Sequence, residues 1–215
     1  MAKQFDIVIY GATGYTGRLV AEHFLREYGD SPDAPTWAMA GRNPDKLAEV
    51  KREIGAPDST PTIVADAADA TSLAQMCEQA KVIITTVGPY QLYGEPLLAA
   101  CAKSGTHYAD LCGEPAWMRQ MIDKYHDDAK ASGARISFSS GFDSIPFDLG
   151  VLMLQKEAKE RFGEPCSRVR GRVRAMKGTF SGGTAASLAE SMKAMARDPS
   201  LIKIMRSPFG LTPGF

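Results

Sequence analysis

Three glycines near the start of the chain have the spacing of a turn that could bind a diphosphate. Gly11, Gly14 and Gly17 lie between an apolar run at 5–10 and an amphipathic segment. In a strand–turn–helix unit they would allow a tight turn, close approach of the main chain to the anion, and close helix–strand packing. A plain strand-to-helix turn is the alternative, but the flanking strand and helix patterns favour nucleotide binding. The residues predicted to bind the dinucleotide here are Gly11, Ala12, Thr13, Gly14, Tyr15, Thr16 and Gly17.

The residues after the second predicted strand, at 36–40, bear on which dinucleotide is bound. NAD sites usually place a carboxylate there to bond the ribose 2′-hydroxyl, but this chain has Gly41 and Arg42. Arg42 could pair with a 2′-phosphate or stack on adenine, so NADP is the predicted cofactor. Alternatively, Arg42 is a solvated residue in the first turn of the next helix. Asp66, after the third predicted strand at 62–65, could accept from the adenine amine or serve only as a turn residue.

The fourth predicted strand, at 81–87, should place a second group of residues beside the cofactor. Its continuous apolar run, KVIITTV, is typical of a central parallel strand that is covered on both faces. Ligands of open α/β sheets bind outside the carboxyl ends of such strands, at the point where the strand order reverses. The residues expected to border the nicotinamide are therefore Val87, Gly88, Pro89 and Tyr90.

A cofactor-dependent reduction also needs a hydrogen-bond donor and a proton. Tyr90, His107 and Tyr108 are candidate donors, because we expect each to follow or end a strand at the ligand edge. Asp143, in the loop after the sixth predicted strand at 135–139, could orient a donor or the nicotinamide amide. The structural alternatives are that Tyr90 packs, that His107 is a satisfied strand histidine, and that Asp143 caps the next helix. The catalytic candidates are Tyr90, His107 and Asp143.

The elements that must position these residues alternate strand and helix six times within the first 145 residues. This pattern predicts an α/β fold with a doubly wound parallel sheet, a Rossmann domain at 1–145. From 146 to 215 the pattern changes to a long helix, an alternating strand at 167–176 and a further helix, the start of an α+β domain. These elements cannot bury a core alone, so we expect a truncated substrate or dimerisation domain and a homodimer formed through it.

Composition excludes several other classes of protein. With 25 basic and 25 acidic residues the net charge is zero, and we expect no nucleic-acid partner. No apolar run is long enough to span a membrane. The four cysteines are scattered without a C-x-x-C pair, which indicates reduced thiols in a cytoplasmic protein and no metal site.

Several segments together resemble the saccharopine dehydrogenase-like oxidoreductases, and most closely their trans-acting enoyl reductase branch. The matching segments are GATGYTGRLVAEHF, AGRNPDKL, TTVGPYQLYGEPLLAACAKSGTHYADLCGE, GFDSIPFDLG and GTFSGGTAAS. The resemblance implies an NADP-dependent oxidoreductase that reduces an enoyl double bond on an acyl or lipid intermediate. Peripheral association with lipid or membrane would suit such a substrate.

Two other functions stay open at the level of sequence. Saccharopine dehydrogenases proper form or break a C–N bond, and the residues lacking from this chain could supply the carboxylate-binding arginines for that reaction. A non-catalytic dinucleotide-binding sensor or scaffold would fit the absence of an unmistakable acid–base set in the sequence.

Overall fold

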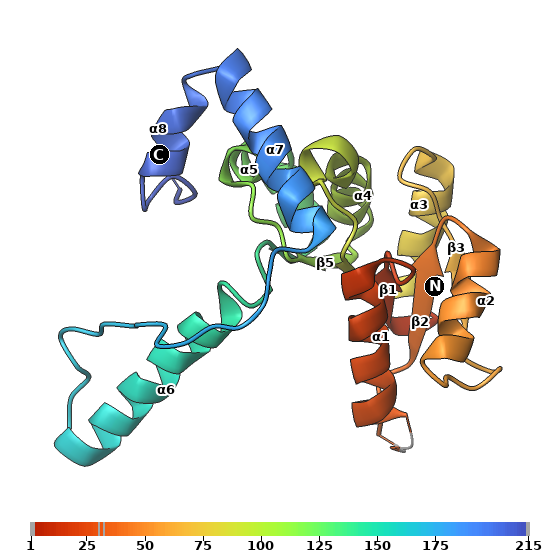
Figure 1. Cartoon of the computed structure of the whole chain (residues 1–215), viewed down its shortest axis with the longest axis horizontal. Helices are drawn as coiled ribbons and strands as arrows, with labels where there is room; N and C mark the ends of the chain where they lie inside the picture. Colours follow the sequence, from red (N-terminus) through yellow and green to blue (C-terminus); the bar gives the residue numbers. More distant parts are fainter. Residues whose placement is uncertain (1–2, 30, 32, 214–215) are drawn as a thin grey trace.

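A six-stranded parallel sheet forms the centre of the computed structural model, which describes residues 3–29, 31 and 33–213 (Figure 1). The strand order is β3-β2-β1-β4-β5-β6. From β1 the strands β2 and β3 extend the sheet to one edge, and β4, β5 and β6 extend it from β1 to the other edge. This is the order of a Rossmann fold, and it confirms the predicted doubly wound sheet. The strands are β1 Phe5–Tyr10, β2 Trp37–Gly41, β3 Thr62–Val64, β4 Ala80–Thr85, β5 His107–Asp110 and β6 Ile136–Ser137.

Helices cover the two faces of the sheet in two groups. Right-handed crossovers place helices on opposite faces when the strand order reverses. On one face, Ile9 and Met39 of the sheet pack with Ala21 of α1 and Leu47 of α2. On the other, Val8 and other strand residues form a larger core with α3, α4 and α5. These helices are α1 Tyr15–Tyr28, α2 Pro44–Glu53, α3 Ala70–Gln79, α4 Tyr90–Ser104 and α5 Pro115–Ser132.

Local sequence signals set several of the helix ends. The Asn43 side chain accepts a hydrogen bond from Lys46 N at 3.0 Å, and Pro44 is the first helical residue of α2. The carboxylate of Asp69 caps α3 by accepting from Thr71 N at 2.9 Å. Helix α5 ends at the C-cap residue Gly133, whose φ of 81° suits glycine.

Beyond the sheet, the chain forms three further helices, α6 Ile145–Phe162, α7 Gly182–Arg197 and α8 Leu201–Arg206. Helix α6 projects away from the sheet, while α7 packs against α4 and α8 against α5 (Figure 1). Many apolar side chains of α6 are exposed, and Met153 is 70 % exposed. No helix within the described ranges is long and apolar enough to cross a membrane.

The strand predicted at 167–176 is absent, because residues 163–181, all of which are described, form neither a helix nor a paired strand. A strand requires a neighbour for its main-chain hydrogen bonds, and no other segment in the described ranges lies alongside it as one. A side-chain anchor in this stretch joins Gln155 of α6 to the main chain of Cys166, at 2.8 and 3.0 Å. Residues 167–176 therefore have the alternating pattern of a strand but do not form the hydrogen bonds to a neighbouring strand that this pattern predicts.

Asp6 connects three strands at the amino-terminal edge of the sheet. Its carboxylate accepts from Thr36 N and Thr36 Oγ1, both at 2.8 Å, just before β2. Lys81 of β4 donates to the other carboxylate oxygen at 2.6 Å. These hydrogen bonds, chiefly the one from Lys81, lower the pKa of Asp6 to about 2.

We expect Asp6→Asn to lower the free energy of unfolding at pH 6. In acid the substitution should lower it much less. The folded pKa is below the unfolded value of 3.8, so the stabilisation is complete above pH 4 and disappears as the pH falls towards 2. Urea unfolding of both proteins at pH 6 and pH 3 measures the change, with Asp127→Asn on the exposed side of α5 as control. A difference between wild type and Asp6→Asn that is the same at both pH values would contradict this account.

Candidate functional site

The glycine turn between β1 and α1 brings the main chain of residue 17 against that of residue 11. A β-carbon added to Gly17 would lie 2.1 Å from the Gly11 carbonyl oxygen, which no side chain could tolerate. Gly11 itself has a φ of 88°, and a β-carbon there would lie 2.8 Å from Thr86 Oγ1 and from Val87 Cγ2. Both positions therefore require glycine, as the spacing of the triplet predicts.

The amino end of α1 is open to an anion. Its N-cap is Gly14, which has no capping side chain, and the first turn contains no acidic residue. Within the described ranges, the main-chain N–H groups of Tyr15, Thr16 and Gly17 donate to no protein acceptor. Together with the helix dipole, these donors form a cradle that fits a diphosphate.

The ends of β2 and β4 meet the same turn. Gly11 N and Ala12 N both donate to the Ala40 carbonyl at the end of β2, at 2.9 and 3.1 Å. Thr86 N donates to the Tyr10 carbonyl at 3.0 Å, so the residues after β4 lie beside the turn on its other side. The structure thus brings together the glycine turn, Gly41 and Val87, at the carboxyl edge of the sheet.

Arg42 and Asp66 follow β2 and β3 at this edge. The Arg42 side chain is exposed and makes no hydrogen bond or ion pair with the described residues. Asp66 Oδ1 accepts from Ala68 N at 2.9 Å, which is the turn role that the sequence left open. Burial raises the pKa of Tyr10 to about 12, and the charge of Asp66 adds to this effect while that of Arg42 opposes it. Both charges therefore act near the end of β1.

A second helix begins at the ligand edge, but its amino end is already occupied. The sequence pattern predicts a helix from Glu95 to Ser104, but α4 starts five residues earlier, at Tyr90. The Glu114 carboxylate, which is 1 % exposed, accepts from Tyr90 N and Gln91 N, both at 2.9 Å. The prediction was wrong because this cap comes from a residue 24 positions away in the sequence.

Tyr90 is a buried residue, and its hydroxyl is engaged by the main chain. The hydroxyl donates to the Thr85 carbonyl at 3.2 Å and accepts from Leu111 N at 3.3 Å. Burial, followed by the charge of Asp110, raises the pKa of the phenol above its ordinary value. Tyr90 therefore lies at the expected edge, but these contacts support the packing alternative over proton donation.

The expected position of His107 is wrong. His107 is the first residue of β5, paired with Val82, whereas Asp110 is the strand residue at the carboxyl edge. The ring Nδ1 accepts from Arg135 N at 3.0 Å, so this is the satisfied strand histidine that the sequence left as an alternative. The Tyr108 hydroxyl is also occupied, since it donates to Asp110 Oδ2 at 2.8 Å.

Asp143 lies in the turn before α6, and its side chain is exposed. The N-cap of α6 is Ser144, and no side chain caps that helix, so the capping alternative for Asp143 is not observed. Gly88 and Pro89, which are joined by a cis peptide bond, precede α4. Of the predicted site residues after the glycine turn, Val87, Gly88, Pro89 and Tyr90 are together, while His107 is not with them.

Two buried carboxyl groups, those of Asp110 and Glu114, accept hydrogen bonds from main-chain N–H groups at this edge, and the sequence patterns predicted a role for neither. Asp110 accepts from Cys112 N at 2.9 Å and from Ser139 N at 2.8 Å, besides the Tyr108 hydroxyl. The contact holds Ser139 in a left-handed conformation with a φ of 55°. Burial raises the pKa of Asp110 above its ordinary value. The sequence offered two signals for these roles: Asp110 lies near the end of a predicted strand, and Glu114 directly precedes Pro115.

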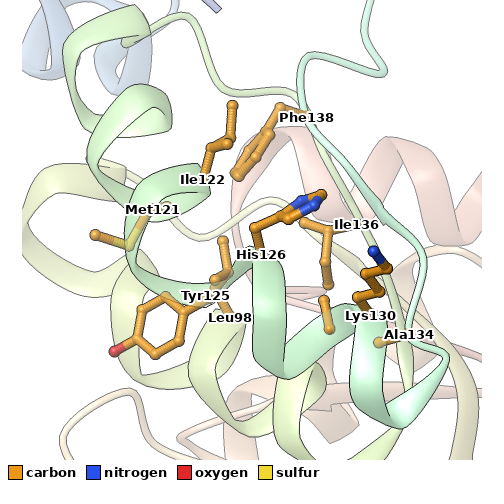
Figure 2. A pocket seen from close by; sticks show the side chains of 10 residues that line it. Leu98, Met121, Ile122, Tyr125, His126, Lys130, Ala134, Ile136 and Phe138 are labelled. Atoms are coloured by element: carbon orange, nitrogen blue, oxygen red, sulfur yellow. The ribbon is translucent and has the colours of Figure 1, made fainter. Parts of the chain in front are cut away.

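A separate hollow of about 350 Å³ lies at the outer edge of the sheet (Figure 2). It lies between α5 and β6, and its wall includes Met121, Ile122 and Phe138, with His126 and Lys130 beside them. None of the glycine-turn residues lines it. This hollow is therefore separate from the open edge at the glycine turn.

We expect Glu114→Gln to destabilise the protein by about 1–3 kcal/mol, since one of two buried N–H groups would lose its charged acceptor. Urea unfolding at neutral pH measures the loss. Glu95→Gln is a matched control on α4, because Glu95 pairs with Lys124 at the surface and an exposed pair contributes about 0–1 kcal/mol. Equal losses in the two variants would show that the buried cap has no special role.

Comparisons with known proteins agree with this geometry. A family model described as the saccharopine dehydrogenase NADP binding domain matches residues 7–136. A provisionally named trans-acting enoyl reductase of Mycobacterium tuberculosis is 44 % identical over 212 residues, which are 98 % of this chain and 50 % of that protein. The trans-acting enoyl reductase of Mycobacterium leprae is 42 % identical over 213 residues, with the same two coverages. The chain thus spans about half the length of the curated relatives it matches.

Among solved structures, apo saccharopine dehydrogenase (L-Glu forming) from Saccharomyces cerevisiae has a TM-score of 0.52 and 13 % identity. The match covers 73 % of this chain and 31 % of the yeast chain, and at this identity it shows the fold alone. The family model, by contrast, covers more than half of the chain and includes both the glycine turn and Arg42. The chain therefore belongs to the saccharopine dehydrogenase family and carries its NADP-binding domain.

Proposed function

We propose that this chain binds NADPH as part of a reductase that saturates the double bond of an enoyl group on an acyl or lipid intermediate. The observation that carries the proposal is the open amino end of α1 beside Arg42, whose side chain has no partner within the described ranges. The enoyl reductase names of relatives at 42–44 % identity support the choice of reaction.

Each part of the edge has a role in this proposal. The N–H groups of Tyr15, Thr16 and Gly17 bind the diphosphate, and Arg42 binds the 2′-phosphate. The loop from Val87 to Tyr90 borders the nicotinamide. When bound, NADPH supplies a hydride; with one proton from solvent or a side chain, it reduces the carbon–carbon double bond, and NADP⁺ is formed.

The proton donor of this reaction is not among the groups that the protein already engages. The hydroxyls of Tyr90 and Tyr108 are held by Thr85, Leu111 and Asp110. Asp143 is exposed in the loop after β6, and we retain it as an orienting residue for the nicotinamide end. The proton then comes from water or from a side chain other than those of these two tyrosines.

We expect Arg42→Ala to weaken NADPH binding by about tenfold to a hundredfold, because it removes a charge-assisted hydrogen bond to the 2′-phosphate. NADH, which lacks that phosphate, should bind the variant and the wild type with similar affinity. Titration calorimetry with the two cofactors measures both constants.

Lys46→Ala, in the first turn of α2, is the matched control, because it removes an exposed positive charge four residues after Arg42. A wild-type protein with equal affinity for NADPH and NADH would overturn the cofactor assignment. Binding of NADPH with no oxidation in the presence of enoyl thioesters or of imines would instead favour a sensor or scaffold function.

The exposed apolar side chains of α6 support a related proposal, that residues 146–215 contribute to a homodimer interface. Burial of such a surface against a second copy would remove apolar area from water. A protein that associates with lipid at the cytoplasmic side of a membrane is also consistent with an acyl or lipid substrate. Light scattering of the purified protein tests the first of these proposals.

A further inference from the structure

Helix α7 comes from the part of the chain beyond the sheet, yet it contacts the first turn of α4 and the loop that precedes it. The Gln91 side-chain amide donates to Ser191 Oγ of α7 at 3.1 Å, across 100 residues of sequence. One turn earlier on α7, Ser187 approaches Gly88, where an added β-carbon would lie 3.8 Å from Ser187 Oγ. Because residues four apart lie on the same side of a helix, one face of α7 meets this loop.

Unlike the Ser191 hydroxyl, the Ser187 hydroxyl has no hydrogen-bond partner among the described residues. It is half-buried, and it makes no hydrogen bond to any side chain or main-chain group that the structure describes. A helical serine commonly bonds the carbonyl four residues earlier, but Ser187 does not. Gly88, which it faces, is exposed, so a ligand can reach this part of the loop.

Two other polar groups of this edge, on Tyr90 and Glu114, cannot serve the nicotinamide end without being released first. The Tyr90 hydroxyl has two main-chain partners, and the Glu114 carboxylate is held by two N–H groups of α4. The nicotinamide ribose and carboxamide carry several donors and acceptors that lose water when they bind, and each needs a replacement. A free hydroxyl beside Gly88 can provide one.

We propose that Ser187 hydrogen-bonds the nicotinamide-ribose half of the cofactor, and that the Gln91–Ser191 contact positions α7 for this bond. The inference rests on the proposed NADPH function, and it adds a ligand-contacting residue from outside the sheet domain. Ser187 is thus a binding residue, while Gln91 and Ser191 are positioning residues.

The test compares NADPH with 2′-phospho-ADP-ribose, which carries the adenosine, 2′-phosphate and diphosphate groups but no nicotinamide. Titration calorimetry on the intact protein should show that Ser187→Ala raises the Kd of NADPH by about threefold to tenfold, the effect of one lost hydrogen bond. The Kd of 2′-phospho-ADP-ribose should not change. Ser187→Thr, which keeps the hydroxyl, should bind NADPH nearly as wild type does.

Gln91→Ala should produce the same selective loss, because α7 would lose its anchor. Ser59→Ala, which removes an exposed hydroxyl between α2 and β3, should change neither constant. An unchanged Kd for NADPH in Ser187→Ala, or an equal loss for both ligands, would overturn the inference while leaving the proposed function intact. Wild-type protein that binds neither ligand would instead refute the proposed function.

Discussion

The contact between Gly17 and the carbonyl of Gly11 is the constraint on which the rest of the site depends. An alanine side chain at 17 would lie 2.1 Å from that oxygen, so α1 could not start where it does. The position of α1 determines where its unpaired N–H groups point, and the same turn is fixed on both sides by hydrogen bonds to β2 and β4. A single missing side chain therefore sets the relation between three strands and the anion cradle.

The two helices that begin at this edge have opposite electrostatic character. The amino end of α1 has no capping side chain, whereas the buried Glu114 carboxylate neutralises the amino end of α4. A diphosphate is attracted by the first and repelled by the second. Under the proposed function, this difference favours the diphosphate at α1 and the uncharged carboxamide towards α4.

The sequence predicted the features that depend on neighbouring residues. The six alternating elements, the glycine turn and the Asn43–Pro44 start of α2 all follow from local patterns, and the structure has them. It did not predict features that depend on distant contacts. The start of α4 depends on Glu114, and the satisfied state of His107 depends on the main chain of Arg135. The strand expected at 167–176 also depends on a distant contact, and it does not form because no described segment pairs with it.

The unpaired stretch between α6 and α7 carries its charges in an unusual arrangement. The arginines occupy alternate positions, at Arg168, Arg170, Arg172 and Arg174, so in an extended conformation all four would share one side. If two copies of this stretch aligned edge to edge, like charges would stand opposite one another and repel. A strand with acidic side chains on the matching side would be attracted. This spacing of guanidinium groups thus discourages fibril-like self-association while leaving the main chain available to a complementary strand.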